Sequence, residues 1–230
     1  MPKVSIITRA RNRLEYTIRC VDAVIRCTDK EDYEHLVINQ LSSDGTRQWL
    51  DWIGRYGGEW FSHVRAIDLD RNAGDWGGML IGIEYAKGQY VVQLDNDIVV
   101  SPGWLGTLLE VLDGTEYGTV QPNRKGSGLN ALPVDGSTEF VRPDGTVLQL
   151  GRRKVATGCY LCAAQDVRDA RSRQPPRNCR MLTRNVAGGA CMIMDLYVEE
   201  LDGSDTESDR SRFLQQRKYP RTSPQIWETL

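Results

Sequence analysis

The sequence predicts an α/β fold in which a mixed, mostly parallel sheet is flanked by helices. Apolar β-branched runs, typical of buried parallel strands, alternate with segments of helical periodicity. Such an alternation implies parallel strands joined by helices that cover both faces of the sheet. The chain has 230 residues, 40% of them hydrophobic and 26% charged, which suits a globular domain with a sizeable core. We therefore expect a single domain over residues 1–230.

The first strand and helix are predicted from the opening residues. The run VSIIT at 4–8 predicts a buried strand. In the segment 12–27 apolar residues recur at helical spacing, at Leu14, Ile18, Val21 and Ile25. Asn12 and Glu15 resemble a capping box, so we expect the helix to begin there.

The next elements continue the alternation. HLVIN at 35–39 predicts the second strand, and the turn SSDGT leads into a helix at 47–56. VRAIDL at 64–69 predicts the third strand. A helix follows at 74–88, with Gly88 as its expected C-terminal cap.

The second half of the chain is less regular. Residues 137–151 predict a hairpin, because two alternating strands flank a Pro-Asp-Gly turn. Residues 152–184 hold nine Arg or Lys against two Asp. This basic run fits either a solvated arm or a surface that attracts an anionic acceptor, such as a lipid diphosphate or a phosphorylated glycan.

Charge and hydropathy exclude some function classes. A formal net charge of −2 argues against a general nucleic-acid binder. No apolar run approaches the roughly 20 residues of a transmembrane helix, although peripheral membrane association stays open. The start MPKVSIIT has no signal-peptide architecture. We expect a cytoplasmic protein whose six cysteines are thiols.

Two carboxylates stand at the end of the fourth predicted strand, 89–95. Asp95 and Asp97 flank Asn96 between the apolar runs YVV and IVV. Charged side chains seldom sit amid so much apolar surface without a partner, and ligands of parallel sheets bind beyond the carboxyl ends of the strands. Carboxylate oxygens are the ligands that Mg²⁺ and Mn²⁺ prefer, often together with substrate phosphates. We therefore expect a metal-dependent site here.

Several further signals occur in a fixed order along the chain. ITRARNR follows the first strand, and the second strand ends in VINQLSSDGT. Asn72 and Gly74, then AKGQY, Asp-Asn-Asp and finally VAGGACMIM at 186–194 come after them. This order resembles family 2 glycosyltransferases, the inverting enzymes with the nucleotide-diphosphosugar transferase (GT-A) fold. The resemblance covers residues 4–112 in register and 138–194 loosely.

The resemblance implies transfer of a sugar from a nucleoside-diphosphate sugar to a hydroxyl of a glycan, lipid-linked or other acceptor. It implies that Asp97 binds Mn²⁺ or Mg²⁺, and that Asp95 contacts the metal or the ribose. Residues 1–100 would bind the nucleotide sugar and residues 101–230 the acceptor. The residues implied at the nucleotide sugar are Arg9, Ala10 (through its backbone), Arg11, Asn39, Asn72, Gly74, Asp95 and Asn96.

The chain departs from the family pattern at several of these places, including GDWGGMLIG at 74–82, where the family more often has small residues and asparagine. Asn39 replaces an aspartate that usually bonds the nucleotide base, and an amide can both donate and accept there. Arg9-Ala10-Arg11 replaces the usual Pro-Thr-Tyr. These arginines suit either a diphosphate, which matches their fork of donors, or a solvated loop.

The family's catalytic base is the aspartate of a Glu-Asp pair that this chain lacks. Alignment on Gly203 makes Asp205 the base, whereas counting back from Tyr219 favours Glu207. A carboxylate within reach of the acceptor hydroxyl suits this chemistry. The alternative is a solvated acidic loop that caps the helix expected at 211–218.

Other functions are left open by the sequence. A sugar-nucleotide nucleotidyltransferase should have a Gly-rich phosphate loop after the first strand, but TRARNRLE has no glycine. A non-catalytic nucleotide- or glycan-binding module is the third possibility. Four cysteines also offer half of a zinc-ribbon pattern, at Cys159, Cys162, Cys179 and Cys191.

Overall fold

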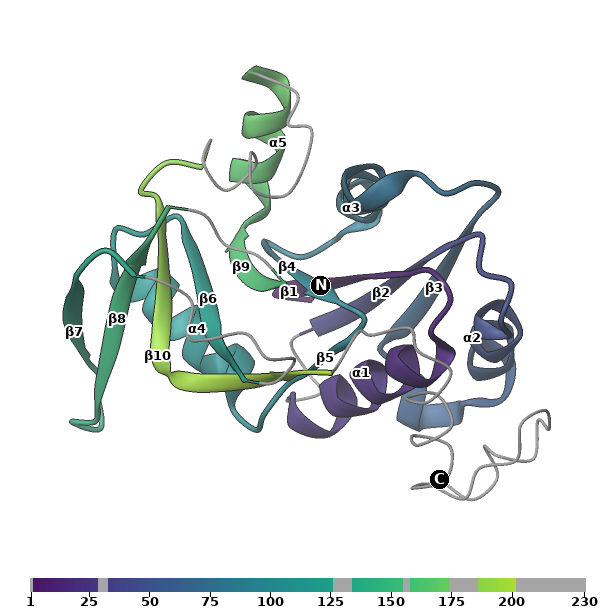
Figure 1. Ribbon diagram of the computed structural model, residues 1–230, viewed down its shortest axis with the longest axis horizontal. Coiled ribbons are helices and arrows are strands. Elements are labelled where there is room, and N and C mark those ends of the chain that lie inside the picture. Colours follow the sequence, from purple (N-terminus) through teal and green to yellow (C-terminus); the bar gives the residue numbers. More distant parts are fainter. Residues whose placement is uncertain (1, 29–32, 126–133, 155–157, 174–185, 202–230) are drawn as a thin grey trace.

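The computed structural model describes residues 2–28, 33–125, 134–154, 158–173 and 186–201, which form one ten-stranded sheet with helices on both of its faces (Figure 1). The strands are β1 Val4–Ala10, β2 Tyr33–Gln40, β3 Val64–Leu69, β4 Tyr90–Asp95, β5 Ile98–Val99, β6 Thr119–Lys125, β7 Ser137–Val141, β8 Val147–Arg153, β9 Cys159–Ala163 and β10 Ala190–Glu200. The helices are α1 Leu14–Cys27, α2 Thr46–Tyr56, the short 3₁₀ helix η1 Gly58–Phe61, α3 Gly74–Tyr85, α4 Trp104–Gly114 and α5 Ala164–Arg173. This arrangement confirms the predicted fold class.

The order of strands in the sheet is β3-β2-β1-β4-β9-β6-β10-β8-β7, and β5 pairs with β10. The first four strands in this order are parallel. In the other half, β6 and β10 are parallel, while β9 is antiparallel to both β4 and β6. Because β1, β2, β3 and β4 run in one direction, their carboxyl ends lie along the same edge of the sheet.

Three apolar clusters cover the two faces of the sheet. On one face, α1 and α4 pack against Val4, Ile6 and their neighbours, and α1 and α2 share a second cluster with Val37. On the opposite face, α3 and α5 pack against Ile7 and Leu36. Successive residues of β1 and β2 therefore point to opposite faces, as expected for buried strands.

Two predicted helix ends are wrong, for identifiable reasons. The helix α1 begins at Leu14 and has no side-chain cap from Asn12 or Glu15. Its first backbone N–H is instead capped by Asp44, whose Oδ2 accepts from Leu14 N at 2.9 Å. The helix α3 ends at Tyr85, and Gly88 lies so close to β1 that a Cβ there would be 2.6 Å from Ser5 N.

Two other features of the second half match the sequence. The strands β7 and β8 form the predicted hairpin, which closes through Arg142 N donating to Thr146 O at 2.8 Å. The predicted strand at 186–194 is present as β10, although it begins at Ala190 and continues to Glu200. In the part of the chain that the structure describes, no helix is long and apolar enough to cross a membrane.

Four of the cysteines and histidines in the described residues pack within the fold or against its aromatic side chains. Cys159 and Cys162 are buried and belong to clusters on opposite faces of the sheet, so they do not share a ligand. His35 is buried, and its Nε2 lies 2.8 Å from Thr8 Oγ1. His63 stacks on Tyr33 with ring centroids 4.9 Å apart. Cys179 lies outside the described residues.

Candidate active site

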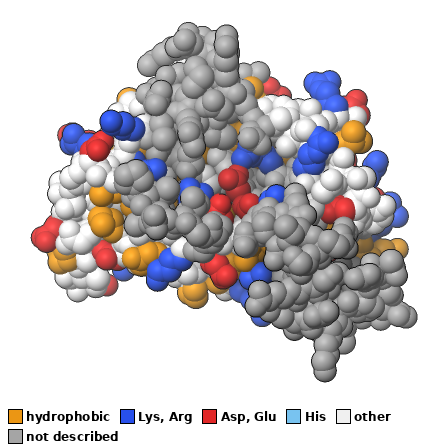
Figure 2. Space-filling view, viewed as in Figure 1, with side chains coloured by type: hydrophobic (Ala, Val, Ile, Leu, Met, Phe, Trp, Pro, Cys, Tyr) orange, Lys and Arg blue, Asp and Glu red, His pale blue; other side chains and the backbone are white. Residues whose placement is uncertain are grey.

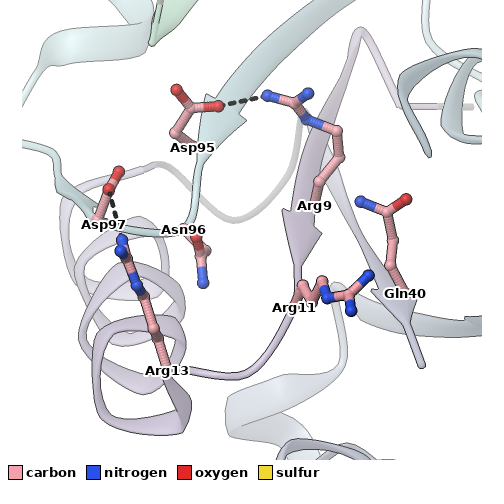
Figure 3. A pocket seen from close by; sticks show the side chains of 7 residues that line it. All are labelled: Arg9, Arg11, Arg13, Gln40, Asp95, Asn96 and Asp97. Carbon is pink, nitrogen blue, oxygen red and sulfur yellow. Dashed lines mark hydrogen bonds and ion pairs between the residues drawn. The ribbon is translucent and has the colours of Figure 1, made fainter. Parts of the chain in front are cut away.

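The carboxyl ends of β1, β2 and β4 surround one polar cavity of about 240 Å³ (Figure 3). Figure 2 shows acidic side chains near the middle of this face of the molecule, with basic side chains beside them. The residues that line the cavity are Arg9, Arg11, Arg13, Gln40, Asp95, Asn96 and Asp97. Five of these were predicted from the sequence as site residues.

Arg9 and Asp95 face each other across two parallel strands. They are partners in the register of β1 and β4, and Arg9 donates to Asp95 Oδ1 at 2.5 Å. The same oxygen accepts from Gln93 Nε2 at 2.6 Å. The Arg9 side chain is only 9% exposed and that of Asp95 is 35% exposed, so a largely buried guanidinium holds in place a carboxylate that stays accessible.

Arg13 comes from the turn that precedes α1. Asn12 and Arg13 both have φ near +55°, at 54° and 56°, a conformation that costs energy for residues other than glycine and clusters at functional sites. The turn is tied to the loop after β2, because Asn12 N donates to Ser42 Oγ and Asn12 Oδ1 accepts from Ser43 N, both at 2.8 Å. This brings the Arg13 guanidinium 3.5 Å from Asp97 Oδ2.

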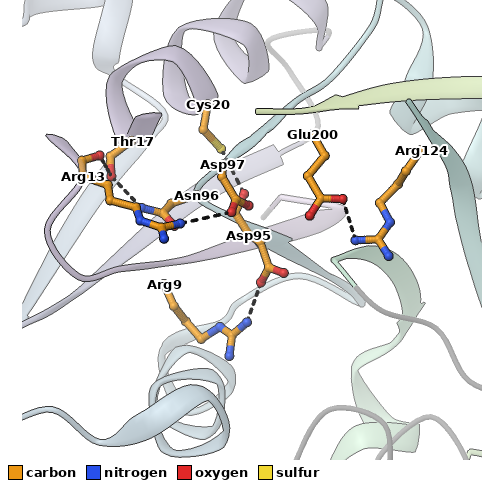
Figure 4. A network of polar contacts seen from close by, with 9 residues as sticks. All are labelled: Arg9, Arg13, Thr17, Cys20, Asp95, Asn96, Asp97, Arg124 and Glu200. Carbon is orange, nitrogen blue, oxygen red and sulfur yellow. Dashed lines mark hydrogen bonds and ion pairs between the residues drawn. The ribbon is translucent and has the colours of Figure 1, made fainter. Parts of the chain in front are cut away.

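The Asp-Asn-Asp turn is anchored to α1 on its other side (Figure 4). Asn96 Nδ2 donates to Thr17 Oγ1 at 3.0 Å, and Cys20 Sγ lies 3.6 Å from Asp95 O. These two contacts tie the turn that carries both carboxylates to α1.

Glu200 at the end of β10 and Arg124 of the neighbouring strand β6 lie beside Asp97 (Figure 4). Arg124 donates to Glu200 Oε2 at 2.9 Å, and Asp97 O accepts from Leu201 N at 2.7 Å. Burial, and then the Glu200 carboxylate, raise the pKa of Asp97, while Arg13 and Arg124 act in the opposite direction. The site therefore favours a positive charge next to Asp97.

Four predicted nucleotide-binding residues do not line this cavity. The Ala10 side chain is buried in the apolar cluster of α1 and α2, and Asn72 forms a local turn in which its Oδ1 accepts from Gly74 N at 2.9 Å. Asn39 is 1% exposed; its amide donates to Asp68 at 2.6 Å and accepts from Ser42 N at 3.2 Å.

Sequence reasoning missed Arg13, Gln40, Glu200 and Arg124. Arg13 follows Arg9 and Arg11 at the same spacing, and Gln40 ends the same strand as Asn39, so both carried a signal in the sequence. Gln40 Oε1 accepts from Ala73 N at 3.1 Å and joins the cavity to the start of α3. The predicted bases Asp205 and Glu207 lie outside the described residues.

The donor set fits a divalent metal only in part. Arg13 is 3.5 Å from Asp97, longer than the usual 2.7–2.9 Å or so of a tight charge-assisted bond, so this carboxylate can accept a second cation. Among the described residues there is no group of three or more His, Cys, Asp or Glu placed to hold a metal. Substrate phosphates and water would have to complete the coordination, as they commonly do for Mg²⁺.

The sequence matches known proteins over most of its length. Residues 5–168 match the profile of glycosyl transferase family 2. A relative from Sodalis glossinidius (strain morsitans), an undecaprenyl-phosphate 4-deoxy-4-formamido-L-arabinose transferase, is 31% identical over 172 residues, 70% of this chain and 52% of that protein. The succinoglycan biosynthesis protein ExoO of Rhizobium meliloti (strain 1021) is 28% identical over 113 residues, 49% of this chain and 30% of that protein. The chain spans about half the length of the undecaprenyl-phosphate transferase that it matches, and less of ExoO.

Solved structures share the fold at low sequence identity. S. aureus TarS 1–349 in complex with UDP-GlcNAc has a TM-score of 0.65 and 14% identity, and the match covers 93% of this chain and 65% of that one. GalNAc-T7 with UDP, GalNAc and Mn²⁺ has a TM-score of 0.68 and 15% identity, and the match covers 93% of this chain and 48% of that one. These structures show the fold, and the profile match over residues 5–168 shows the family: the chain belongs to glycosyl transferase family 2.

Proposed function

We propose that the protein transfers a sugar from a nucleoside-diphosphate sugar to an acceptor hydroxyl, with inversion at the anomeric carbon. The observation that carries this proposal is the cavity at the ends of β1, β2 and β4, where arginines and the Asp-Asn-Asp turn converge in a family 2 chain. The guanidinium groups of arginines match the oxygens of a diphosphate with parallel N–H donors. A polar cavity at the carboxyl ends of parallel strands is a common place for a nucleotide to bind.

The donor diphosphate would lie against Arg9 and Arg11, with Asp95 and Asn96 beside it. Asp95 is fixed by two hydrogen-bond donors, so it presents a carboxylate of constant position to a ribose hydroxyl or a metal-bound water. The assignments of Ala10, Asn39, Asn72 and Gly74 to the nucleotide remain predictions.

A bound Mn²⁺ or Mg²⁺ would be held by Asp97, with Asp95 near it, and would supply positive charge to the departing nucleoside diphosphate. The GalNAc-T7 structure contains Mn²⁺, which supports a divalent ion in this fold. Burial and the Glu200 carboxylate raise the pKa of Asp97. Both effects disfavour the charged carboxylate, and a bound cation would offset them.

The acceptor would be deprotonated by Asp205, with Glu207 as the alternative, and both assignments rest on the family pattern. Glu200 lies beside Asp97, but its ion pair with Arg124 suits a positioning role. The names of the undecaprenyl-phosphate relatives support a lipid-linked acceptor, and the name of ExoO supports a glycan product. We assign the acceptor to the 101–230 half.

The second candidate is a non-catalytic nucleotide-binding module. Asn39 favours it, because the amide is committed to Asp68 and Ser42 and the usual aspartate is missing. The absence of a Gly-rich loop in TRARNRLE argues against a nucleotidyltransferase.

A nucleotide and metal screen tests the proposal. Thermal unfolding of the full chain is measured with UDP, GDP and their sugar conjugates, each with and without Mn²⁺, because a bound ligand raises the apparent stability. At least one nucleoside diphosphate should raise the melting temperature, and its sugar conjugate should be hydrolysed slowly on incubation. If the conjugate stabilises the protein but is neither hydrolysed nor used for sugar transfer to added acceptors, the non-catalytic binding module is favoured.

Asp97→Asn tests the metal assignment. This variant should lose most of the additional stabilisation that Mn²⁺ gives to the nucleotide complex, because the amide is a weaker ligand than the carboxylate. Asp51→Asn on the exposed face of α2 is the matched control and should respond like the parent chain. An unchanged Mn²⁺ response in Asp97→Asn would place the metal elsewhere.

A further inference from the structure

Three arginines, and not only aspartates, converge on the cavity. Arg9, Arg11 and Arg13 occupy alternate positions from the end of β1 to the residue before α1 (Figure 3). With Asp95 and Asp97 they give the lining three positive and two negative formal charges, a net charge of +1. The cavity is therefore attractive to an anion through the chain's own side chains.

The three arginines are held in different ways. Arg9 bonds Asp95 at 2.5 Å and Arg13 lies 3.5 Å from Asp97. Arg11 is exposed and lines the cavity, and within the described ranges it has no hydrogen bond or ion pair. Among the described residues, no carboxylate therefore competes with a ligand for its guanidinium.

We propose that these arginines bind the nucleoside diphosphate directly, so that a large part of its affinity persists without a divalent metal. A guanidinium keeps its charge at all working pH values and matches two phosphate oxygens with parallel N–H donors. Arg11 makes the direct contact, and the guanidinium groups of Arg9 and Arg13 add positive charge to the lining beside it. The inference rests on the proposed function, because it concerns the same donor site.

The charge of Asp97 gives the inference a distinctive consequence. Asp97→Asn changes the net formal charge of the lining from +1 to +2, which favours an anionic diphosphate if the arginines bind it. Asp97→Asn should therefore keep or increase metal-free affinity while it lowers the additional affinity given by Mn²⁺. A site that needs the metal would instead lose all nucleotide binding in this variant.

Calorimetric titration of the full chain with UDP, GDP and inorganic pyrophosphate, in EDTA and in Mn²⁺, tests the inference. At least one nucleoside diphosphate should bind in EDTA within about tenfold of its affinity in Mn²⁺. Arg11→Ala should weaken binding in EDTA by roughly 10-fold to 100-fold, the range for lost hydrogen bonds to a charged group. Arg11→Lys should weaken it less. Arg55→Ala, which removes an exposed arginine of α2 outside the cavity, should leave it unchanged.

The possible failures are distinguishable. If a nucleoside diphosphate binds in Mn²⁺ and not in EDTA, or if Arg11→Ala binds in EDTA like the parent chain, the inference is overturned and the proposed donor stands. If no nucleoside diphosphate binds in either condition, the proposed donor fails as well. Binding of pyrophosphate in EDTA that Arg11→Ala weakens supports direct contact with the phosphates.

Discussion

The imidazole of His35 should make the stability of the protein depend on pH. The ring, on β2, is fully buried beside Thr8 of β1, and burial lowers its pKa from 6.5 to about 3. In the unfolded chain the imidazole keeps an ordinary pKa of about 6.5. Between these two values the unfolded state binds a proton that the folded state does not, so the free energy of unfolding falls as the pH falls.

The size of this effect follows from the two pKa values. From about pH 7.5 to about pH 5, protonation of an ordinary imidazole in the unfolded state lowers the free energy of unfolding by about 2 kcal/mol. His35→Gln removes the titrating group and keeps a polar partner for Thr8, so the variant should lack this part of the pH dependence. Urea denaturation followed by tryptophan fluorescence, at both pH values, measures the difference.

His63→Gln is the matched control for this experiment. His63 bonds Tyr33 O at 3.0 Å on the other side of β2, and His35 is still present in that variant. It should therefore retain the loss of stability in acid. If His35→Gln loses as much stability as the parent chain between the two pH values, the buried neutral imidazole is not responsible and the reasoning is refuted.

Two further predictions concern packing and capping. Gly82→Ala should lower the free energy of unfolding by about 1–3 kcal/mol, because the new Cβ would lie 2.3 Å from Ile7 Cγ2; Gly54→Ala, in a helix with open space around it, should instead raise stability by up to about 1 kcal/mol. A loss in both variants on urea denaturation would contradict the packing argument. Asp44→Ala should cost about 0.5–2 kcal/mol, because Asp44 caps the first turns of both α1 and α2. Asp51→Ala is its surface control, and equal effects of the two changes would argue against capping.

The parallel half of the sheet could be predicted because its signals are local. Each of β1 to β4 is a short apolar run between helical segments, so pattern alone places it within a residue or two. The capping of α1 could not be predicted in this way. Its cap, Asp44, comes from a loop 30 residues along the chain, and a local Asn-x-x-Glu pattern at Asn12 competed with it. Gly88 was misassigned for a similar reason, since its close approach to Ser5 is a tertiary contact.

The location of the candidate site could be predicted from the sequence, but most of the contacts between its side chains could not. The carboxyl edge of the sheet and the Asp-Asn-Asp turn were both visible in the sequence. The pairing of Arg9 with Asp95 depends on the register of β1 and β4, and that of Glu200 with Arg124 on the path of β10. Such long-range pairings are not encoded in the spacing of residues along the chain.

Asp95 and Asp97 are two residues apart and yet have opposite surroundings. Asp95 receives donors from Arg9 and Gln93 on one oxygen, so its charge is already compensated and its direction fixed. Asp97 is half-buried, lies near Glu200 and is 3.5 Å from the Arg13 guanidinium, so desolvation and repulsion disfavour its charged form. An added cation would relieve both effects at Asp97 and would gain little at Asp95. On the basis of these different surroundings we propose different roles: Asp95 as a fixed acceptor for the donor substrate, and Asp97 as the carboxylate that would take a cation.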